Sequence, residues 1–103
     1  MHLIAWRTLR EYIETLDGHT DQAKVRKALR EWRSSVEKAA WTSPADVKAA
    51  FGSASILKSG RAVFNICGNS YRLVVKINYG NGVVFVRFIG THAAYDEIDA
   101  EEV

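Results

Sequence analysis

Several features are scarce in this sequence of 103 residues, and each scarcity excludes a class of protein. The single cysteine, Cys67, rules out an internal disulfide, and no Cys/His spacing typical of a metal site occurs. No apolar run approaches the roughly 20 residues that span a bilayer. The opening MHLIAWRTLREYI contains an apolar stretch too short for a signal peptide. We therefore expect a cytoplasmic protein without a metal, a disulfide or a membrane contact.

Acidic residues are absent between residues 47 and 95, although the chain has 12 acidic and 14 basic side chains in all. The same stretch contains six basic residues: Lys48, Lys58, Arg61, Arg72, Lys76 and Arg87. The first 46 residues are nearly neutral, and five acids lie among the last eight residues. A long stretch free of carboxylates suits a surface that faces phosphates. Chance segregation of charge in a small domain is the alternative.

Helical periodicity dominates the first half of the chain. Apolar residues at 3–4 spacing predict a helix over residues 6–16, which Asp17 and Gly18 end. A longer helix follows over residues 20–40, with Thr20 or Asp21 as its cap and Val25, Leu29, Trp32 and Val36 in its apolar stripe. Its opposite, basic face is either a solvated helix surface or a contact for nucleic acid or a partner. Ser43 and the only proline, Pro44, predict a short helix that ends at residue 51.

After Gly52 the apolar period changes from 3.6 to 2, which is typical of strands. Four strands are predicted, over residues 54–58, 62–67, 71–79 and 83–89, joined by Gly- and Asn-containing turns. Residues 2–4 form either another short strand or the approach to the first helix. The chain is thus predicted to be one α+β domain over residues 1–103. Its N-terminal helices pack on one face of a curved antiparallel sheet, with a short C-terminal helix, and Trp32 is buried against Leu73, Val75 or Ile77.

Strand alternation predicts a basic face on the side of the sheet that the helices leave open. Arg72, Val74, Lys76 and Asn78 point to this face, and the neighbouring strand contributes Arg61, Val63, Asn65 and Cys67. If the loop at residues 80–82 has an even residue count, Arg87 shares this face and lies almost opposite Lys76. Opposed like charges destabilise a sheet, which an anionic ligand would offset. The alternative is an ordinary wet face with long basic side chains.

The stretch GTHAAYDEID, residues 90–99, places three proton-bearing or proton-accepting groups directly after a basic strand. Thr91 is a plausible N-cap, and a helix start suits phosphate. On the helix that follows, His92, Tyr95 and Asp96 share one face. His92 suits general acid–base chemistry, and Tyr95 lies outside the alternating strands, where it can stack on a base. The alternative is a capped terminal helix without chemistry.

A family resemblance covers residues 64–99, which read FNICGNSYRLVVKINYGNGVVFVRFIGTHAAYDEID. The strand pair with FNI, GN and YRLV, the strand VKINY, the strand end VRFIGTH and the helix YDEID together resemble the C-terminal half of HigB-type toxins. These are the toxins of type II toxin–antitoxin systems in the RelE superfamily. The N-terminal half resembles them in layout only.

The resemblance implies a RelE-like fold and a metal-independent, cofactor-free endoribonuclease that cleaves mRNA on the ribosome. It also implies a HigA-type antitoxin with a helix-turn-helix as partner. The catalytic residues would be His92, Arg72, Lys76, Arg87 and Tyr95. The RNA-binding residues would be Lys58, Arg61, Asn65 and Thr91.

Three questions stay open at this point. No second histidine or well-placed glutamate accompanies His92, so the general base and the general acid are not assigned. Asp96 either orients His92 or caps charge near the helix start. The alternative functions are a non-catalytic RNA- or ribosome-binding domain with the same basic face, and a protein-interaction domain whose bases meet an acidic partner.

Overall fold

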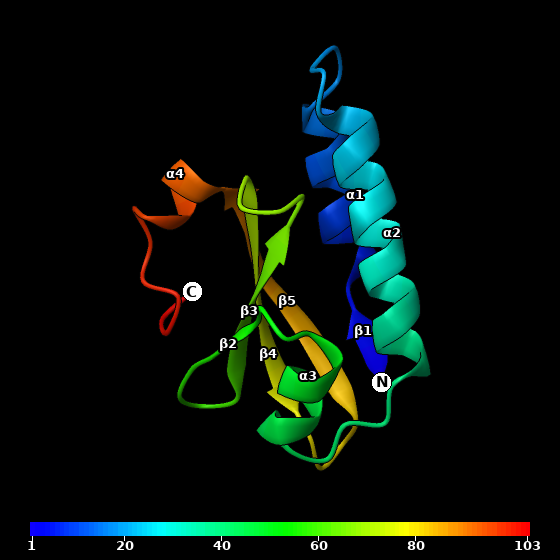
Figure 1. Ribbon diagram of the computed structural model, residues 1–103, viewed down its shortest axis with the longest axis vertical. Coiled ribbons are helices and arrows are strands. Elements are labelled where there is room, and N and C mark those ends of the chain that lie inside the picture. Colours follow the sequence, from blue (N-terminus) through cyan, green and yellow to red (C-terminus); the bar gives the residue numbers. More distant parts are fainter.

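The computed structural model describes residues 1–103 and arranges two long helices against one side of a twisted sheet (Figure 1). The helices are α1 (Trp6–Thr15), α2 (Gln22–Lys38), α3 (Pro44–Ala50) and α4 (His92–Tyr95). The strands are β1 (His2–Ile4), β2 (Ser55–Ile56), β3 (Arg61–Ile66), β4 (Tyr71–Asn78) and β5 (Val83–Thr91). The class is α+β, as predicted. No helix has both the length and the apolar character needed to cross a membrane.

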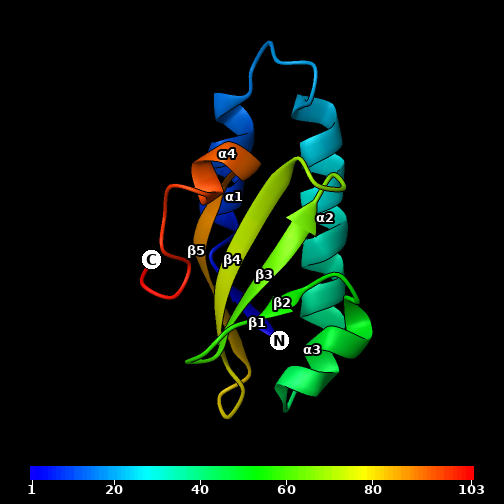
Figure 2. The same ribbon diagram turned by 60° about the vertical axis from the view of Figure 1, so that its left-hand side comes forward.

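The five strands form one mixed sheet in the order β1-β5-β4-β3-β2 (Figure 2). The predicted antiparallel meander is present from β2 to β5. The prediction of a wholly antiparallel sheet was wrong, because β1 joins the far edge in parallel to β5, with Leu3 opposite Val84. A parallel pair between chain segments so far apart has no turn motif in the sequence. The first meander strand is also shorter than predicted, at two residues.

Helix α2 packs on the sheet through the apolar stripe that its spacing predicts. Val25, Leu29, Trp32 and Val36 are all buried, with at most 3% of their surface exposed. On its basic side, Lys24, Lys27 and Arg30 are exposed. Arg33 stacks its guanidinium carbon 4.8 Å from the ring centre of Trp6 and pairs with Glu37 at 3.3 Å. At least part of this basic side therefore stabilises the helix layer itself.

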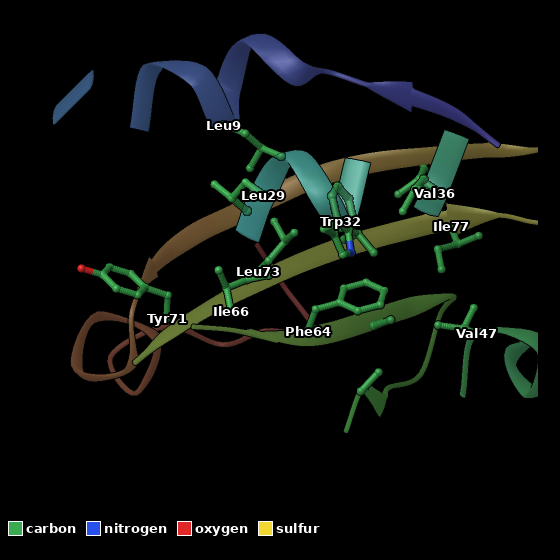
Figure 3. Close-up of a cluster of buried hydrophobic side chains, with 14 of the residues drawn as sticks. Leu9, Leu29, Trp32, Val36, Val47, Phe64, Ile66, Tyr71, Leu73 and Ile77 are labelled. Atoms are coloured by element: carbon green, nitrogen blue, oxygen red, sulfur yellow. The ribbon is translucent and has the colours of Figure 1, made fainter. Parts of the chain in front are cut away.

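The core centres on Trp32 and Phe64, whose rings meet edge to face with centroids 5.5 Å apart (Figure 3). Phe51 meets Phe64 in the same way at 5.0 Å, and each such aromatic pair contributes about 0.5–1.5 kcal/mol beyond area burial. The predicted burial of Trp32 is confirmed, in one cluster with Leu73, Val75 and Ile77. Its closest ring partner comes from β3 rather than from β4.

A buried tyrosine ties the start of α2 to the sheet. The hydroxyl of Tyr71, a residue only 3% exposed, donates to the carboxylate of Asp21 at 3.0 Å. Burial and this carboxylate together raise the pKa of Tyr71 to about 12, because both disfavour the phenolate. The same Asp21 precedes α2 as its N-cap residue, although its side chain makes no cap bond. The hydrogen bond therefore fixes the α1–α2 turn beside the first residue of β4.

Replacing Tyr71 by Phe should lower the free energy of unfolding by about 2 kcal/mol at neutral pH, because it removes one hydrogen bond to a carboxylate. The folded pKa lies above the unfolded value of about 10, so this contribution is complete below pH 10 and is lost as pH rises toward 12. Denaturant unfolding of both proteins between pH 8 and pH 12 measures the difference. The ionisation of Tyr12 and Tyr79 affects the unfolding of both proteins and therefore cancels in the difference. A difference that stays constant to pH 12 would contradict the assignment.

Candidate functional site on the open face of the sheet

The open face is the side of the sheet turned away from α1 and α2. Cross-strand pairing arranges its side chains in three rows across β3, β4 and β5. The first row is Asn65, Arg72 and Gly90; the second is Val63, Val74 and Phe88; the third is Arg61, Lys76 and Phe85. The faces predicted for β3 and β4 are therefore confirmed. Cys67 is the exception, because it lies in the turn after β3 and packs against the core.

The apolar second row divides the basic residues of the open face into two groups. Arg72 and Lys76 are four residues apart on one strand, which separates their Cα atoms by about 13 Å. The His92 cluster comprises Asn65, Arg72, Thr91, His92 and Tyr95. The Arg61 cluster comprises Arg61, Lys76 and Arg87, with Lys58 in the adjoining turn, where the Lys58 carbonyl accepts from the Arg61 N–H at 3.3 Å. The nine predicted site residues thus form two groups rather than one.

Arg87 does not lie opposite Lys76, the position predicted for an even loop, because the hairpin register that pairs Asn78 with Val83 puts Phe85 there. Beyond that point β5 contains a bulge. The pairing shifts between Val74 and Val75, so that Val74 faces Phe88 instead of Arg87. Arg87 is the residue left without a partner, which re-aims its side chain. The like charges that do lie directly opposite each other are Arg61 and Lys76. Such a pair is destabilising unless something anionic lies nearby.

Arg61 is unusual for an arginine, since only 9% of its surface is exposed. One of its terminal nitrogens donates to the main-chain oxygen of Val103, and Nε of Arg87 donates to the same oxygen at 3.2 Å. Nε of Arg61 is buried and has no hydrogen-bond partner. Two guanidinium groups therefore converge on one point of the open face.

Arg72 is held in place by the turn between β3 and β4. Its guanidinium donates to the carbonyl oxygen of Asn69 at 2.9 Å and to the side-chain oxygen of Asn69 at 3.0 Å. Cys67 and Gly68 both adopt positive φ in this turn, at 54° and 66°, which brings Asn69 back toward the start of β4. From the sequence, Asn69 is predicted only to be a turn residue. Its position three residues before Arg72 is the pattern that could have predicted this contact.

Helix α4 is a single turn anchored at several points. The Thr91 hydroxyl accepts from the Ala94 N–H at 3.1 Å, which confirms Thr91 as N-cap. The His92 N–H donates to the Ser70 carbonyl at 3.0 Å. With two of its first amides already bonded, the helix start offers less to a phosphate than its sequence suggested.

Gly90 allows the helix to lie close to the strand. A Cβ atom at Gly90 would come within 2.7 Å of the Phe88 ring and 3.4 Å of the Ala94 side chain. The absence of a side chain at this position therefore lets the Phe88 ring fold over the strand end. It also leaves Ala94, and with it α4, close to the sheet.

His92 projects from α4 with about half of its side chain, 52%, exposed to solvent. Its Nε2 lies 3.4 Å from Oδ1 of Asp96, which is itself 61% exposed. Asp96 is the C-cap residue of α4 and therefore lies at the opposite end from the helix start. The charged partner of its carboxylate is the His92 imidazole. Tyr95 is half-buried and its hydroxyl has no protein partner.

No hollow or metal-like cluster marks this face. The two surface hollows lie elsewhere: one of about 270 Å³ between α2 and β3, lined by Trp32, Phe64 and Cys67 among others, and a second beside Met1 and Trp41. Asn65 alone among the predicted site residues borders either hollow. No three His, Cys, Asp or Glu side chains gather in the way a metal ion requires.

Comparison with protein families gave one match. The model of the family described as HigB_toxin, RelE-like toxic component of a toxin-antitoxin system, matches residues 25–98. This range contains every residue of both clusters and excludes β1 and α1. A search of curated proteins gave no match.

Replacing Thr91 by Val should loosen α4, because it keeps the shape of the side chain but removes the acceptor for the Ala94 N–H. We expect a loss of about 1 kcal/mol in unfolding free energy and faster hydrogen exchange at Ala94. Thr20→Val is the matched control, since Thr20 is exposed and its hydroxyl makes no hydrogen bond. Unchanged exchange at Ala94 in Thr91→Val would contradict the anchoring role.

Proposed function

Because the chain belongs to the HigB family of RelE-like toxins, we propose that it is an endoribonuclease that cleaves mRNA in the cytoplasm, on the ribosome. The observation that carries the proposal is a solvent-exposed histidine, His92, whose main-chain N–H is bonded to Ser70 in the same turn whose Asn69 holds the Arg72 guanidinium. Both stand at the edge of a face without strand carboxylates. A phosphodiester can approach such a corner without repulsion.

The reaction we propose uses the 2′-hydroxyl of the RNA itself. The 2′-oxygen attacks the adjacent phosphorus, its proton is removed, and the bond to the 5′-oxygen breaks as that oxygen gains a proton. The products are a 2′,3′-cyclic phosphate and a 5′-hydroxyl. Protein groups are needed to transfer the two protons and to stabilise the charge that develops on the phosphate.

The His92 cluster supplies these groups. His92 is the general acid or the general base, with Asp96 close enough to orient its imidazole. Arg72 neutralises the developing charge on the phosphate, and its two bonds to Asn69 lower the cost of positioning it. Tyr95 stacks on or orients a nucleotide, Asn65 hydrogen-bonds a base or phosphate, and Thr91 holds the helix that carries His92.

The Arg61 cluster binds a different part of the RNA. Its distance of about 13 Å along the strands from Arg72 supports a role for Lys76, Arg87 and Arg61 at phosphates that flank the cleaved bond. Lys58 extends this group at the adjoining turn. We therefore assign Lys76 and Arg87 to binding of the RNA chain rather than to the chemical step.

The partner that the family implies is an antitoxin. We propose that it is a HigA-type protein with a helix-turn-helix, encoded beside the toxin. The second candidate function is a non-catalytic RNA- or ribosome-binding domain that uses the same open face. It would need the two clusters as phosphate contacts but would need no acid or base.

Replacing His92 by Ala separates these two functions. We expect cleavage to fall by about 10²- to 10⁴-fold, because the variant lacks a proton-transfer group, while RNA affinity changes little. Cleavage of a translated mRNA and growth inhibition on induction are the measurements. His2→Ala is the matched control, since His2 is exposed on β1 at the far edge of the sheet. Full cleavage by folded His92→Ala would exclude His92 from the chemistry.

Replacing Arg72 or Lys76 by Ala should weaken RNA binding through the loss of one phosphate contact. For single-stranded RNA, each lost contact reduces the slope of log affinity against log salt by about 0.7. Arg72→Ala should also reduce cleavage beyond its effect on binding, whereas Lys76→Ala should affect binding alone. Lys27→Ala on the exposed side of α2 is the control and should leave both unchanged. An unchanged salt slope in both variants would show that RNA binds another part of the protein surface.

A further inference from the structure

The C-terminal segment, residues 96–103, lies on the open face of the sheet. After α4 the chain turns back along the side opposite α1 and α2 (Figures 1 and 2). At its end, the main-chain oxygen of Val103 accepts hydrogen bonds from both Arg61 and Arg87. The segment thus connects the His92 cluster, where it begins, to the Arg61 cluster, where it ends.

Burial on the open face indicates how the segment is seated. Val63 and Val74 point away from the helices, yet only 3% and 0% of their surfaces are exposed. Besides the long side chains of the neighbouring rows, α4 and the C-terminal segment lie on that side of the sheet (Figure 1). Within the segment, Ile98, Ala100 and Val103 are half-buried, whereas its acidic residues are exposed: Asp96, Glu97, Asp99, Glu101 and Glu102. An apolar side therefore faces the sheet and an acidic side faces solvent.

The contacts of the segment leave the arginines incompletely satisfied. None of its five carboxylates forms an ion pair with Arg61, Lys76 or Arg87; the only ion pair is that of Asp96 with His92. The Nε of Arg61 remains buried without a partner. A phosphate group has enough oxygens to accept from Nε and a terminal nitrogen of one guanidinium together, whereas in the seated segment the Nε of Arg61 has no acceptor.

We propose that the C-terminal segment is an intramolecular competitor of RNA, which occupies the Arg61 cluster and the apolar row until a nucleic acid phosphate displaces it. This rests on the proposed function only in that the open face binds RNA. The apparent dissociation constant of a site equals its intrinsic value divided by the fraction of molecules in which the site is free. Closure of the segment over the open face therefore weakens binding, and its acidic side repels any phosphate chain that approaches the face.

The test uses the full chain and a single-stranded DNA oligonucleotide, which has no 2′-hydroxyl and is not cut. The triple variant Asp99→Asn, Glu101→Gln, Glu102→Gln removes three exposed charges from the segment. We expect it to bind the oligonucleotide about tenfold more tightly than the wild type. The matched control is Glu11→Gln, Glu14→Gln, Glu37→Gln, which changes net charge equally on exposed helix positions away from the open face. It should change affinity much less.

Hydrogen exchange supplies a second measurement, independent of any substitution. In the seated segment, the amides of Glu102 and Val103 donate to the Asp99 carbonyl at 3.0 and 3.1 Å. Saturating wild-type protein with the oligonucleotide should speed exchange at these two amides, because the segment leaves the face. Equal or slower exchange on binding would overturn the proposal, as would equal affinities of the two triple variants.

The outcomes separate this proposal from the nuclease function. Tighter binding and faster exchange without any RNA cleavage would retain the competition and reject the nuclease. RNA cleavage with unchanged affinity and unchanged exchange would retain the nuclease and reject the competition. Failure of both wild type and variant to bind the oligonucleotide would reject the competition, because an uncovered Arg61 cluster must bind a phosphate chain.

Discussion

The packing of α2 on the sheet is the contact on which the rest of this structure depends. Trp32 meets Phe64 edge to face, within a cluster that also contains Leu73, Val75 and Ile77. Strand side chains alternate between faces, so residues adjacent in sequence to this core must point the other way. Arg72, Lys76 and Asn65 are therefore placed on the open face by the same apolar contacts that bury Phe64 and Leu73. Hydrophobic burial on one side determines where the charged side lies.

The turn between β3 and β4 then organises one corner of that face. Asn69 binds the Arg72 guanidinium, and Ser70, the next residue, accepts from the His92 N–H. One short turn thus positions both the cation and the imidazole that we assign to the chemistry. The bare Gly90 beneath Phe88 and Ala94 keeps α4 close to the strands. Groups held in this way need little further ordering when a phosphate arrives, which is the condition for effective catalysis by positioning.

The parts of the fold that could be predicted from sequence are those governed by local periodicity. The stripe from Val25 to Val36 located α2 to within about two residues at each end, and alternation assigned the faces of β3 and β4. Long-range pairing had no such signal, so the parallel edge strand at His2–Ile4 was not distinguished from a lead-in to α1.

Side-chain placement in the candidate site shows a similar limit. The predicted pairing of Arg87 with Lys76 failed because the hairpin register puts Phe85 opposite Lys76. The ninth residue of β5, against eight in β4, then forms a bulge at Arg87. The acidic run at the C-terminal end was visible in the sequence, but its position on the open face follows from the hydrogen bonds that Val103 accepts from Arg61 and Arg87. The two-cluster arrangement likewise follows from cross-strand register, which no single strand reveals.

The central claim is that RNA is cleaved through its own 2′-hydroxyl on the open face. Mass spectrometry of the fragments produced from an mRNA on translating ribosomes tests it most directly. The mechanism predicts 5′-hydroxyl ends and 2′,3′-cyclic phosphate ends, or the 3′-phosphate ends to which these open. It also predicts that a single 2′-deoxy nucleotide at the cleavage position blocks the cut. Fragments with 5′-phosphate and 3′-hydroxyl ends, or cleavage that persists at the 2′-deoxy nucleotide, would contradict it.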